Sequence, residues 1–296
     1  MTESEDILVA GATGKQGGAV ARELLGRGYR VRAMTRHPEG EAAQALAELG
    51  AQVVRGDLND PASLAEAVKG VWGVFSVQNT WEAGVEREEE QGKRFARISN
   101  ESGVQHFVYS SVGSADRATG IPHFENKWRV EETVRNLDLP SYTILRPVFF
   151  MENFLAPWLK PGLDEGKLTV GIKPTAVLQM IAVRDIGKYG AWAFDNHQAL
   201  NGRALDIAGD AHTMPETAKI IGAATGRKIE FVPTPIEEVR KFSEDFAMML
   251  EWFDAGGYDV NIKKISAESG IQPTTLVDWA AMVDWSVAPA TEHVFA

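Results

Sequence analysis

The sequence predicts an α/β protein with a Rossmann-type, doubly wound parallel sheet and a smaller C-terminal α+β domain. Two observations carry this prediction. A short apolar run, residues 7–10, leads directly into Gly11, Gly14 and Gly17, and an apolar pattern with helical spacing follows. Short apolar runs then alternate with helical patterns as far as residue 147, as expected for parallel strands joined by crossover helices. Beyond that point the alternation stops, so the rest of the chain is expected to form the second domain.

The three glycines have the spacing G-x-x-G-x-x-G, a variant of the dinucleotide-binding fingerprint. In this role Gly11 makes the turn after the strand, Gly14 lets the backbone approach a pyrophosphate, and Gly17 lets the helix and the strand pack closely. The start of the helix offers unpaired N–H groups and a partial positive charge to the phosphates. The pattern therefore predicts a dinucleotide site.

The second strand, residues 29–34, is followed by Arg36, where NAD-binding chains usually carry Asp or Glu. A guanidinium can pair with the 2′-phosphate of NADP and stack on the adenine. Hydrogen bonds to a charged group are worth roughly 1.5–3 kcal/mol, enough for an about ten- to hundredfold preference for NADP over NAD. The alternative is a solvated surface arginine. Three more residues of the glycine loop are expected to contact the cofactor: Thr13, Lys15, which either holds the same phosphate or faces solvent, and Gln16.

The third strand, residues 51–55, follows a predicted helix over residues 41–49. Asp57 and Leu58 stand at the carboxyl end of this strand, where ligands bind in open α/β sheets. Asp57 is expected to accept a hydrogen bond from the adenine amino group while Leu58 packs on the ring. The alternative is an aspartate that caps a turn or a helix. Asp60, followed by proline, is the expected N-cap of the next helix.

The fourth strand, residues 71–77, leads into Gln78 and Asn79, which are expected to lie beside the central part of the cofactor. Trp81 either walls the nicotinamide pocket or belongs to the core. Residues 82–102 are long and charged, with few apolar positions at helical spacing. This pattern predicts one exposed helix with a thin apolar stripe.

A fifth strand over residues 106–111, a helix over 124–136 and a sixth strand over 142–145 complete the alternation. Residues 148–154 are aromatic and predicted as a loop. The later elements are expected as strands over residues 176–183, 205–208 and 228–232, a helix capped by Asp185 and running to Phe194, a helix from Met214, and mainly helical chain over 236–283. That last segment supplies side chains that belong to the core or line a substrate cleft, namely Met248, Met249, Trp252, Phe253 and Tyr258.

Composition excludes several function classes. The 296 residues include no cysteine, which excludes disulfides, thiolate metal sites, iron–sulfur clusters and a cysteine nucleophile, and agrees with a reducing, cytoplasmic location. The net charge of −11 argues against a nonspecific nucleic-acid surface. No apolar run has the length of a membrane span, and the acidic start lacks the pattern of a signal peptide. The histidines lack metal-ligand spacing, so no metal site is expected. The sequence contains no G-x-S-x-G motif, which argues against a hydrolase.

Several stretches together resemble one family. Residues 11–18, 56–58, 123–127, 142–154 and 185–187 are similar to the NmrA-like (HSCARG-like) branch of the atypical short-chain dehydrogenases/reductases. The resemblance covers essentially the whole chain, and its most specific part is the run Leu-Arg-Pro-Val-Phe-Phe-Met-Glu-Asn-Phe that ends at residue 154.

This resemblance implies an NADP-binding domain over residues 1–150, with a return segment near 180–205, and a smaller, partly interleaved substrate or partner domain over 151–296. It also implies that Lys127 contacts the nicotinamide ribose and that Phe150 and Asn153 line the nicotinamide end. Members of the family are either reductases of quinones, dyes and related carbonyl or alkene compounds, or NADP(H)-binding redox sensors and transcriptional co-regulators.

The larger superfamily uses Tyr-x-x-x-Lys with a serine, and the lysine lowers the pKa of the tyrosine that exchanges a proton with the substrate. Here Lys127 is present, but His123 stands at the tyrosine position. Histidine is a competent acid at neutral pH, so His123 and Lys127 are the candidate catalytic residues; the alternative is a histidine at the helix entry without chemistry. Ser110 or Ser111 falls where the family serine is expected, and Tyr109 is expected to point to the other face of the sheet.

Two functions follow from these observations. The first is an NADPH-dependent oxidoreductase that transfers hydride to a small conjugated carbonyl, quinone or imine, with His123 or water supplying the proton. The alternative is a catalytically weak NADP(H) redox sensor that acts on a regulatory protein through direct contact. Neither reading requires direct nucleic-acid or membrane binding, and both are compatible with an oligomer.

Overall fold

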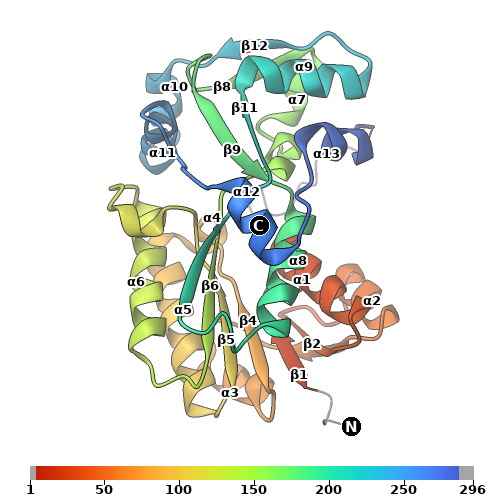
Figure 1. The fold of residues 1–296 in the computed structure, drawn as a ribbon, viewed down its shortest axis with the longest axis vertical. Helices are drawn as coiled ribbons and strands as arrows, with labels where there is room; N and C mark the ends of the chain where they lie inside the picture. Colours follow the sequence, from red (N-terminus) through yellow and green to blue (C-terminus); the bar gives the residue numbers. More distant parts are fainter. Residues whose placement is uncertain (1–4, 287–296) are drawn as a thin grey trace.

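The computed structural model describes residues 5–286 of the chain. A central sheet of seven strands fills the lower half of Figure 1, and two smaller sheets with their helices lie above it. Every pairing within the central sheet is parallel. The predicted α/β fold, a doubly wound parallel sheet with a smaller C-terminal part, is confirmed.

The strands of the central sheet are arranged in the order β10-β6-β5-β4-β1-β2-β3. Their bounds are β1 Asp6–Val9, β2 Arg30–Thr35, β3 Gln52–Arg55, β4 Gly73–Ser76, β5 His106–Ser110, β6 Tyr142–Pro147 and β10 Arg203–Ile207. The chain first builds outward from β1 to β3 and then resumes on the other side of β1 with β4. The carboxyl ends of β1 and β4 therefore flank the crevice in which doubly wound sheets bind ligands.

Helices cover both faces of this sheet, because each face is apolar. On one face lie α1 (Lys15–Gly26), α2 (Glu41–Glu48) and α8 (Val183–Asp195), and on the other lie α3 (Pro61–Val68), α5 (Val85–Glu101) and α6 (Pro122–Asn136). Asp60 is the N-cap of α3 as predicted, since its side chain accepts a hydrogen bond from Ala62 N. Tyr109 of β5 packs with the second group of helices and Val108 with the first, so Tyr109 points to the face predicted for it.

The segment from α8 to β10 returns to the first half of the chain. Helix α8 lies along α1, and a Cβ added to Gly187 would lie 2.7 Å from the carbonyl oxygen of Ala19. The predicted capping role of Asp185 is wrong: the N-cap of α8 is Ala182, and the buried Asp185 carboxylate accepts hydrogen bonds from the backbone and hydroxyl of Thr274. The division at residue 150 stays a prediction.

The upper part of Figure 1 contains a three-stranded sheet in the order β11-β9-β7 and a two-stranded sheet of β12 and β8. The elements outside the central sheet and the helices that cover it are β7 Phe149–Phe150, α7 Lys160–Asp164, β8 Lys167–Val170, β9 Val177–Ile181, β11 Asp210–Thr213, α9 Met214–Thr225, β12 Glu230–Pro233, α10 Ile236–Arg240, α11 Glu244–Asp254, α12 Ile262–Ser269 and α13 Leu276–Met282. Short 3₁₀ helices lie at Ala115–Arg117 and Met151–Leu155. The loop predicted over residues 148–154 is therefore wrong: these residues form β7 and a 3₁₀ turn.

The helix predicted over residues 82–102 is confirmed over Val85–Glu101, but it does not begin at residue 82 and it is less exposed than expected. Gly84, at φ 82°, separates a four-residue helix, α4 (Thr80–Ala83), from α5. Helix α5 packs between α3 and α6 and buries polar residues, among them Glu88 and Gln91. These polar groups have partners within the protein, and such pairing makes their burial tolerable.

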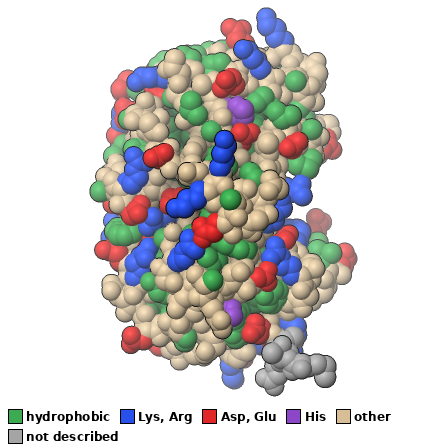
Figure 2. Space-filling model, in the orientation of Figure 1, with side chains coloured by type: hydrophobic (Ala, Val, Ile, Leu, Met, Phe, Trp, Pro, Cys, Tyr) green, Lys and Arg blue, Asp and Glu red, His purple; other side chains and the backbone are tan. Residues whose placement is uncertain are grey.

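Within residues 5–286, no helix combines the length and the apolar character required to cross a bilayer. On the face of the molecule shown in Figure 2, basic and acidic side chains are interspersed.

Candidate functional site

Two adjoining cavities, of about 300 and 120 Å³, lie at the crevice between β1 and β4. Gln16, Gln78 and Asn79 line both, so the two form one continuous cleft. The larger cavity contains the residues predicted for the phosphates and the adenosine, namely Gly11, Thr13, Gly14, Lys15, Gly17, Arg36, Asp57 and Leu58. The smaller contains those predicted for the nicotinamide end and the chemistry, namely His123, Lys127, Phe150 and Asn153. The cleft thus brings all of the predicted site residues together.

The glycine loop is shaped for close approach of a ligand. Gly11 has φ 59°, and Gly14 N donates to Gly11 O at 2.9 Å, which closes the turn. A Cβ on Gly17 would lie 2.3 Å from Gly11 O and 2.5 Å from Ala10 O, so no side chain fits there. Helix α1 begins at Lys15 without a side-chain cap, which leaves its first amides for an anion. These features fit a pyrophosphate.

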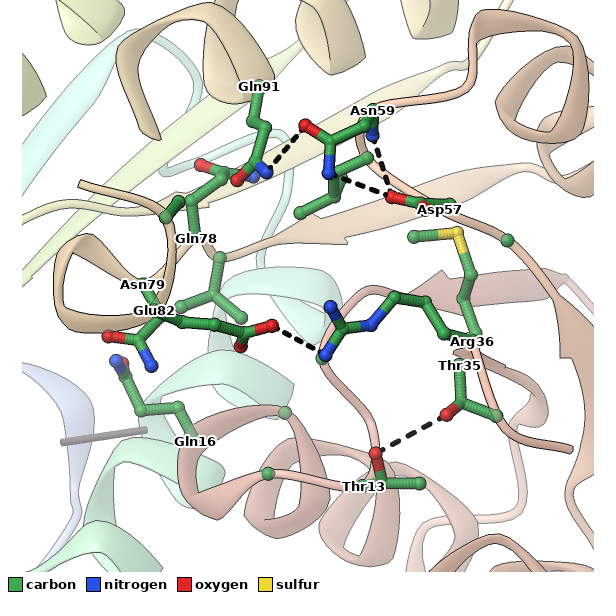
Figure 3. A pocket seen from close by; sticks show the side chains of 18 of the residues that line it. Thr13, Gln16, Thr35, Arg36, Asp57, Asn59, Gln78, Asn79, Glu82 and Gln91 are labelled. Atoms are coloured by element: carbon green, nitrogen blue, oxygen red, sulfur yellow. Dashed lines mark hydrogen bonds and ion pairs between the residues drawn. The ribbon is translucent and has the colours of Figure 1, made fainter. Parts of the chain in front are cut away.

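The larger cavity contains a paired arginine. Arg36 follows β2, and its Nη2 lies 2.5 Å from Glu82 Oε1 on α4 (Figure 3). The two hydroxyls of Thr13 and Thr35 lie 3.5 Å apart below this pair. Arg36 is therefore held at the cleft by an acidic residue that could not be predicted from the sequence. Arg36 follows β2 and Glu82 follows β4, and only the order of the strands in the sheet brings them together.

Asp57 lines the same cavity but is engaged locally. Its Oδ1 accepts from the backbone N and the Nδ2 of Asn59, at 2.8 and 3.2 Å. Asn59 Oδ1 in turn accepts from Gln91 of α5 at 3.0 Å (Figure 3). Asp57 thus makes the turn contacts that were the alternative to adenine recognition, while Leu58 beside it is half-buried in the cavity wall.

Lys127 lies at the other end of the cleft and is paired with a buried carboxylate. Its Nζ lies 2.5 Å from Glu88 Oε1, and Glu88 Oε2 accepts from Asn126 Nδ2 at 2.8 Å and from the hydroxyl of Thr80. Glu88 is fully buried between α5 and α6. The ammonium of Lys127 is therefore fixed in place, with its charge partly compensated. No sequence signal distinguishes Glu88 from its solvated neighbours in that charged helix.

His123 is buried in the smaller cavity and paired with an acid from the distant α11. Its Nδ1 hydrogen-bonds Asp245 Oδ1, and its ring centroid lies 5.3 Å from that of Trp81. Because an ionised carboxylate only accepts, Nδ1 is the donor, and Nε2 is the nitrogen free to exchange a proton. Trp81 thus walls this cavity, half-exposed, rather than belonging to the core.

Serines at the end of β5 lie where the family serine was expected. Ser110 Oγ donates to Gln16 Oε1 at 2.7 Å, and Ser111 lines the smaller cavity. Among the described residues, Ser111 Oγ and Gln78 Oε1 are buried and have no hydrogen-bond partner. Ser111 lines the smaller cavity, so its unpaired hydroxyl lies in the wall of that cavity, whereas Gln78 Oε1 faces α5, 3.0 Å from the position of a Cβ on Gly92.

The C-terminal aromatic cluster divides between the cleft and the core. Met249 and Tyr258 line the smaller cavity, together with Phe246 of α11. Phe253 is buried behind them, and Trp252 packs its edge against Tyr258 with centroids 5.1 Å apart. Met248 does not line this cavity.

Lys15 has an acidic neighbour, Glu152, that could not be predicted from the sequence. Glu152, in the 3₁₀ turn after β7, accepts from Val183 N at 3.0 Å and from Trp279 Nε1 at 3.1 Å. Burial raises the pKa of Glu152 to about 7, against the attraction of Lys15, and burial lowers the pKa of Lys15 against the attraction of Glu152. Lys15 is therefore partly buried beside a carboxylate and does not simply face solvent.

Exchange of Glu152 for glutamine is expected to remove a pH dependence of stability. A carboxyl group whose pKa is raised on folding stabilises the fold below its usual pKa and loses that contribution as the pH rises through about 7. Relative to Glu152→Gln, the wild-type free energy of unfolding should fall by up to about 3 kcal/mol between about pH 5 and 8. Urea unfolding across this range measures it, with the exposed Glu86→Gln as control; a constant difference would contradict the assignment.

Comparison with known proteins adds independent information. A model described as the NmrA-like family matches residues 3–292. An NmrA-like family domain-containing protein of Dictyostelium discoideum is 27% identical over 289 residues, 89% of this chain and 95% of that protein. The NmrA-like family domain-containing oxidoreductase FrzB of Cladobotryum sp. is 30% identical over 253 residues, 77% of this chain and 75% of FrzB.

Three solved structures share the fold. Triphenylmethane reductase of Citrobacter sp., complexed with NADP(H), has a TM-score of 0.77 at 20% identity, over 94% of this chain and 100% of that chain. NmrA, a negative transcriptional regulator in complex with NAD or with NADP, has a TM-score of 0.77 at 18% identity, over 96% and 100%. An NADPH-dependent quinone oxidoreductase of Escherichia coli has a TM-score of 0.76 at 22% identity, over 93% and 98%.

Proposed function

Since this chain belongs to the NmrA-like family of NAD(P)-binding proteins, we propose that it is an NADPH-dependent reductase of a small conjugated carbonyl, quinone or imine. One observation carries the proposal. A single cleft runs from the glycine loop and Arg36 at one end to Lys127 and the His123–Asp245 pair at the other.

Different residues of the cleft bind different parts of the cofactor. The amides at the start of α1 hold the pyrophosphate, Arg36 holds the adenosine phosphate, and Lys127 hydrogen-bonds the nicotinamide ribose. When bound there, the nicotinamide would supply a hydride to the substrate. Phe150 and Asn153 line the smaller cavity together with Lys127, and they orient the nicotinamide ring in that cavity.

His123 supplies the proton that accompanies the hydride. Asp245 fixes the ring through Nδ1, so Nε2–H of the protonated ring can donate to the oxygen or nitrogen that gains negative charge. Lys127 is not placed to activate a tyrosine, since the position four residues before it is His123. The walls of the small cavity include Trp81, Phe246 and Tyr258. Aromatic walls around a small volume favour a flat, conjugated substrate.

Relatives and structural neighbours support both the proposed reductase activity and the proposed use of NADPH. FrzB is described as an oxidoreductase, and two of the structural neighbours are a triphenylmethane reductase and an NADPH-dependent quinone oxidoreductase. A second function, an NADP(H) redox sensor, is favoured by one observation: the tyrosine of Tyr-x-x-x-Lys is absent. NmrA itself is described as a negative transcriptional regulator.

NADPH oxidation against a panel of quinones, conjugated carbonyls and imines tests the proposal. We expect absorbance at the NADPH band to fall with at least one member of the panel, faster with NADPH than with NADH. Fluorescence titration of NADPH with the same protein is the companion measurement. Tight NADPH binding without turnover across the panel would contradict the reductase and favour the sensor.

A further inference from the structure

The larger cavity contains an ion pair between Arg36 and Glu82. A cofactor phosphate that binds Arg36 therefore has to compete with the Glu82 carboxylate. We propose that Glu82 sets the cofactor preference of this chain: its carboxylate accepts from the ribose 2′-hydroxyl of NAD(H) and opposes the 2′-phosphate of NADP(H) at Arg36. The inference rests on the proposed function, because it assigns a second determinant to the same dinucleotide site. It predicts a weaker preference for NADP(H) than Arg36 alone confers.

The geometry places the carboxylate at the point where the two cofactors differ. Arg36 Nη2 and Glu82 Oε1 lie 2.5 Å apart, and the two side chains reach toward each other across the cavity from opposite walls (Figure 3). NAD-binding chains usually supply their acidic residue from the end of the second strand. Here Arg36 occupies that region, and α4 supplies the carboxylate instead.

The position of Glu82 is fixed by the start of α4. Asn79, the N-cap of α4, accepts from Trp81 N at 3.1 Å through its side chain, and its backbone oxygen accepts from Glu82 N at 3.3 Å. Asn79 also lines both cavities. The Glu82 carboxylate is therefore presented from a turn anchored in the cleft wall, and does not extend from a long solvated segment.

Charge balance makes the competition specific. Of the described residues that line the larger cavity, the acidic ones are Asp57 and Glu82, and the basic ones include Lys15, Arg36 and Arg87. Asp57 is engaged by Asn59, so Glu82 is the carboxylate that faces the guanidinium. A phosphate that binds Arg36 must displace this carboxylate or lie against it, whereas a ribose hydroxyl can donate to it and leave the ion pair intact.

Glu82→Gln tests the assignment by binding alone, without turnover. Arg36 and Glu82 are 45% and 37% exposed, so their pair contributes little to stability and the variant keeps the fold. We expect the ratio of the dissociation constants, NADH over NADPH, to rise about tenfold through tighter NADPH and weaker NADH binding. The gain for NADPH should shrink at high salt, because it is electrostatic.

Glu86→Gln is the matched control. It removes the same charge four residues along the chain, from an exposed side chain that does not line the nucleotide cavity, and should leave the ratio unchanged. In an Arg36→Ala background, Glu82→Gln should change NADPH affinity by less than about twofold, since most of the competition is for the guanidinium. An unchanged ratio in Glu82→Gln, with tight binding retained, overturns the role of Glu82 and leaves the reductase intact. Absence of binding of either dinucleotide by the wild type overturns both.

Discussion

Replacement of Gly17 by alanine is expected to abolish dinucleotide binding and to lower the free energy of unfolding by about 3 kcal/mol or more. The added Cβ would lie 2.3 Å from Gly11 O and 2.5 Å from Ala10 O. Both are backbone atoms of the turn itself, so the clash cannot be relieved by a side-chain rotation. Overpacking usually costs about 1–3 kcal/mol, and a clash with fixed backbone lies at or above the upper end of that range. Relief requires the turn to open, which removes the cradle for the pyrophosphate.

The same helix contains a matched control. Gly26, at the exposed end of α1, has no atom within 4 Å of an added Cβ. Gly26→Ala should leave NADPH binding unchanged and alter stability by less than about 1 kcal/mol, in the stabilising direction. Urea unfolding followed by circular dichroism, and titration of NADPH on the folded protein, measure both effects. Equal binding by Gly17→Ala and Gly26→Ala would show that the loop does not hold the cofactor.

Replacement of His123 by alanine is expected to lower kcat by about 10²–10⁴, the range of a lost general acid. NADPH affinity should stay within about threefold of the wild type, because His123 lines the smaller cavity and the phosphate and adenosine contacts lie in the larger. The measurement is steady-state reduction of the best substrate from the panel, together with NADPH titration. Asp245→Asn should lower kcat less and shift the pH profile of kcat, since Asp245 acts by positioning the ring and does not meet the substrate.

His212→Ala is the control for this pair. His212 pairs through Nε2 with Asp210 Oδ2, at 2.9 Å, in β11; this pair is partly exposed and His212 lines neither cavity. Its removal should leave kcat unchanged, which separates loss of a proton donor in the smaller cavity from loss of a histidine–aspartate contact elsewhere in the fold. Full turnover by His123→Ala would assign the proton to water.

The parallel sheet could be predicted because its signals are local. The strands from β1 to β6 are short apolar runs or, in β2, an alternating pattern, and Asp60 followed by proline marks the start of α3 to the residue. β10 could be predicted as a strand, but its place beside β6 depends on α8 packing along α1 through Gly187, a contact between distant segments.

The failures have physical causes. β7 is only two residues long, β8 and β11 contain no continuous apolar run, and each of the three is stabilised by a partner strand remote in sequence. The many charged residues of helix α5 predict a solvent-exposed helix. Glu88 is nevertheless buried, because Lys127, Asn126 and Thr80 pair with its carboxylate. Pairing of this kind cannot be seen in one segment.

The same distinction applies to the site. The glycine loop, Arg36, His123 and Lys127 could be predicted from spacing or from family resemblance, and the fold brings them into one cleft. Their ionic partners could not: Glu82, Glu88 and Asp245 pair with them across sequence separations of dozens of residues or more. These partners decide the charge of the site, and so they determine the expected cofactor preference and the direction of proton transfer.

The most direct test of the account is a crystal structure of the chain with NADPH. We predict the extended cofactor across both cavities, with the 2′-phosphate within hydrogen-bonding distance of Arg36, the pyrophosphate on the amides that open α1, and the nicotinamide beside Lys127 and Phe150, facing His123. A nicotinamide bound outside the smaller cavity, or a 2′-phosphate remote from Arg36, would contradict it.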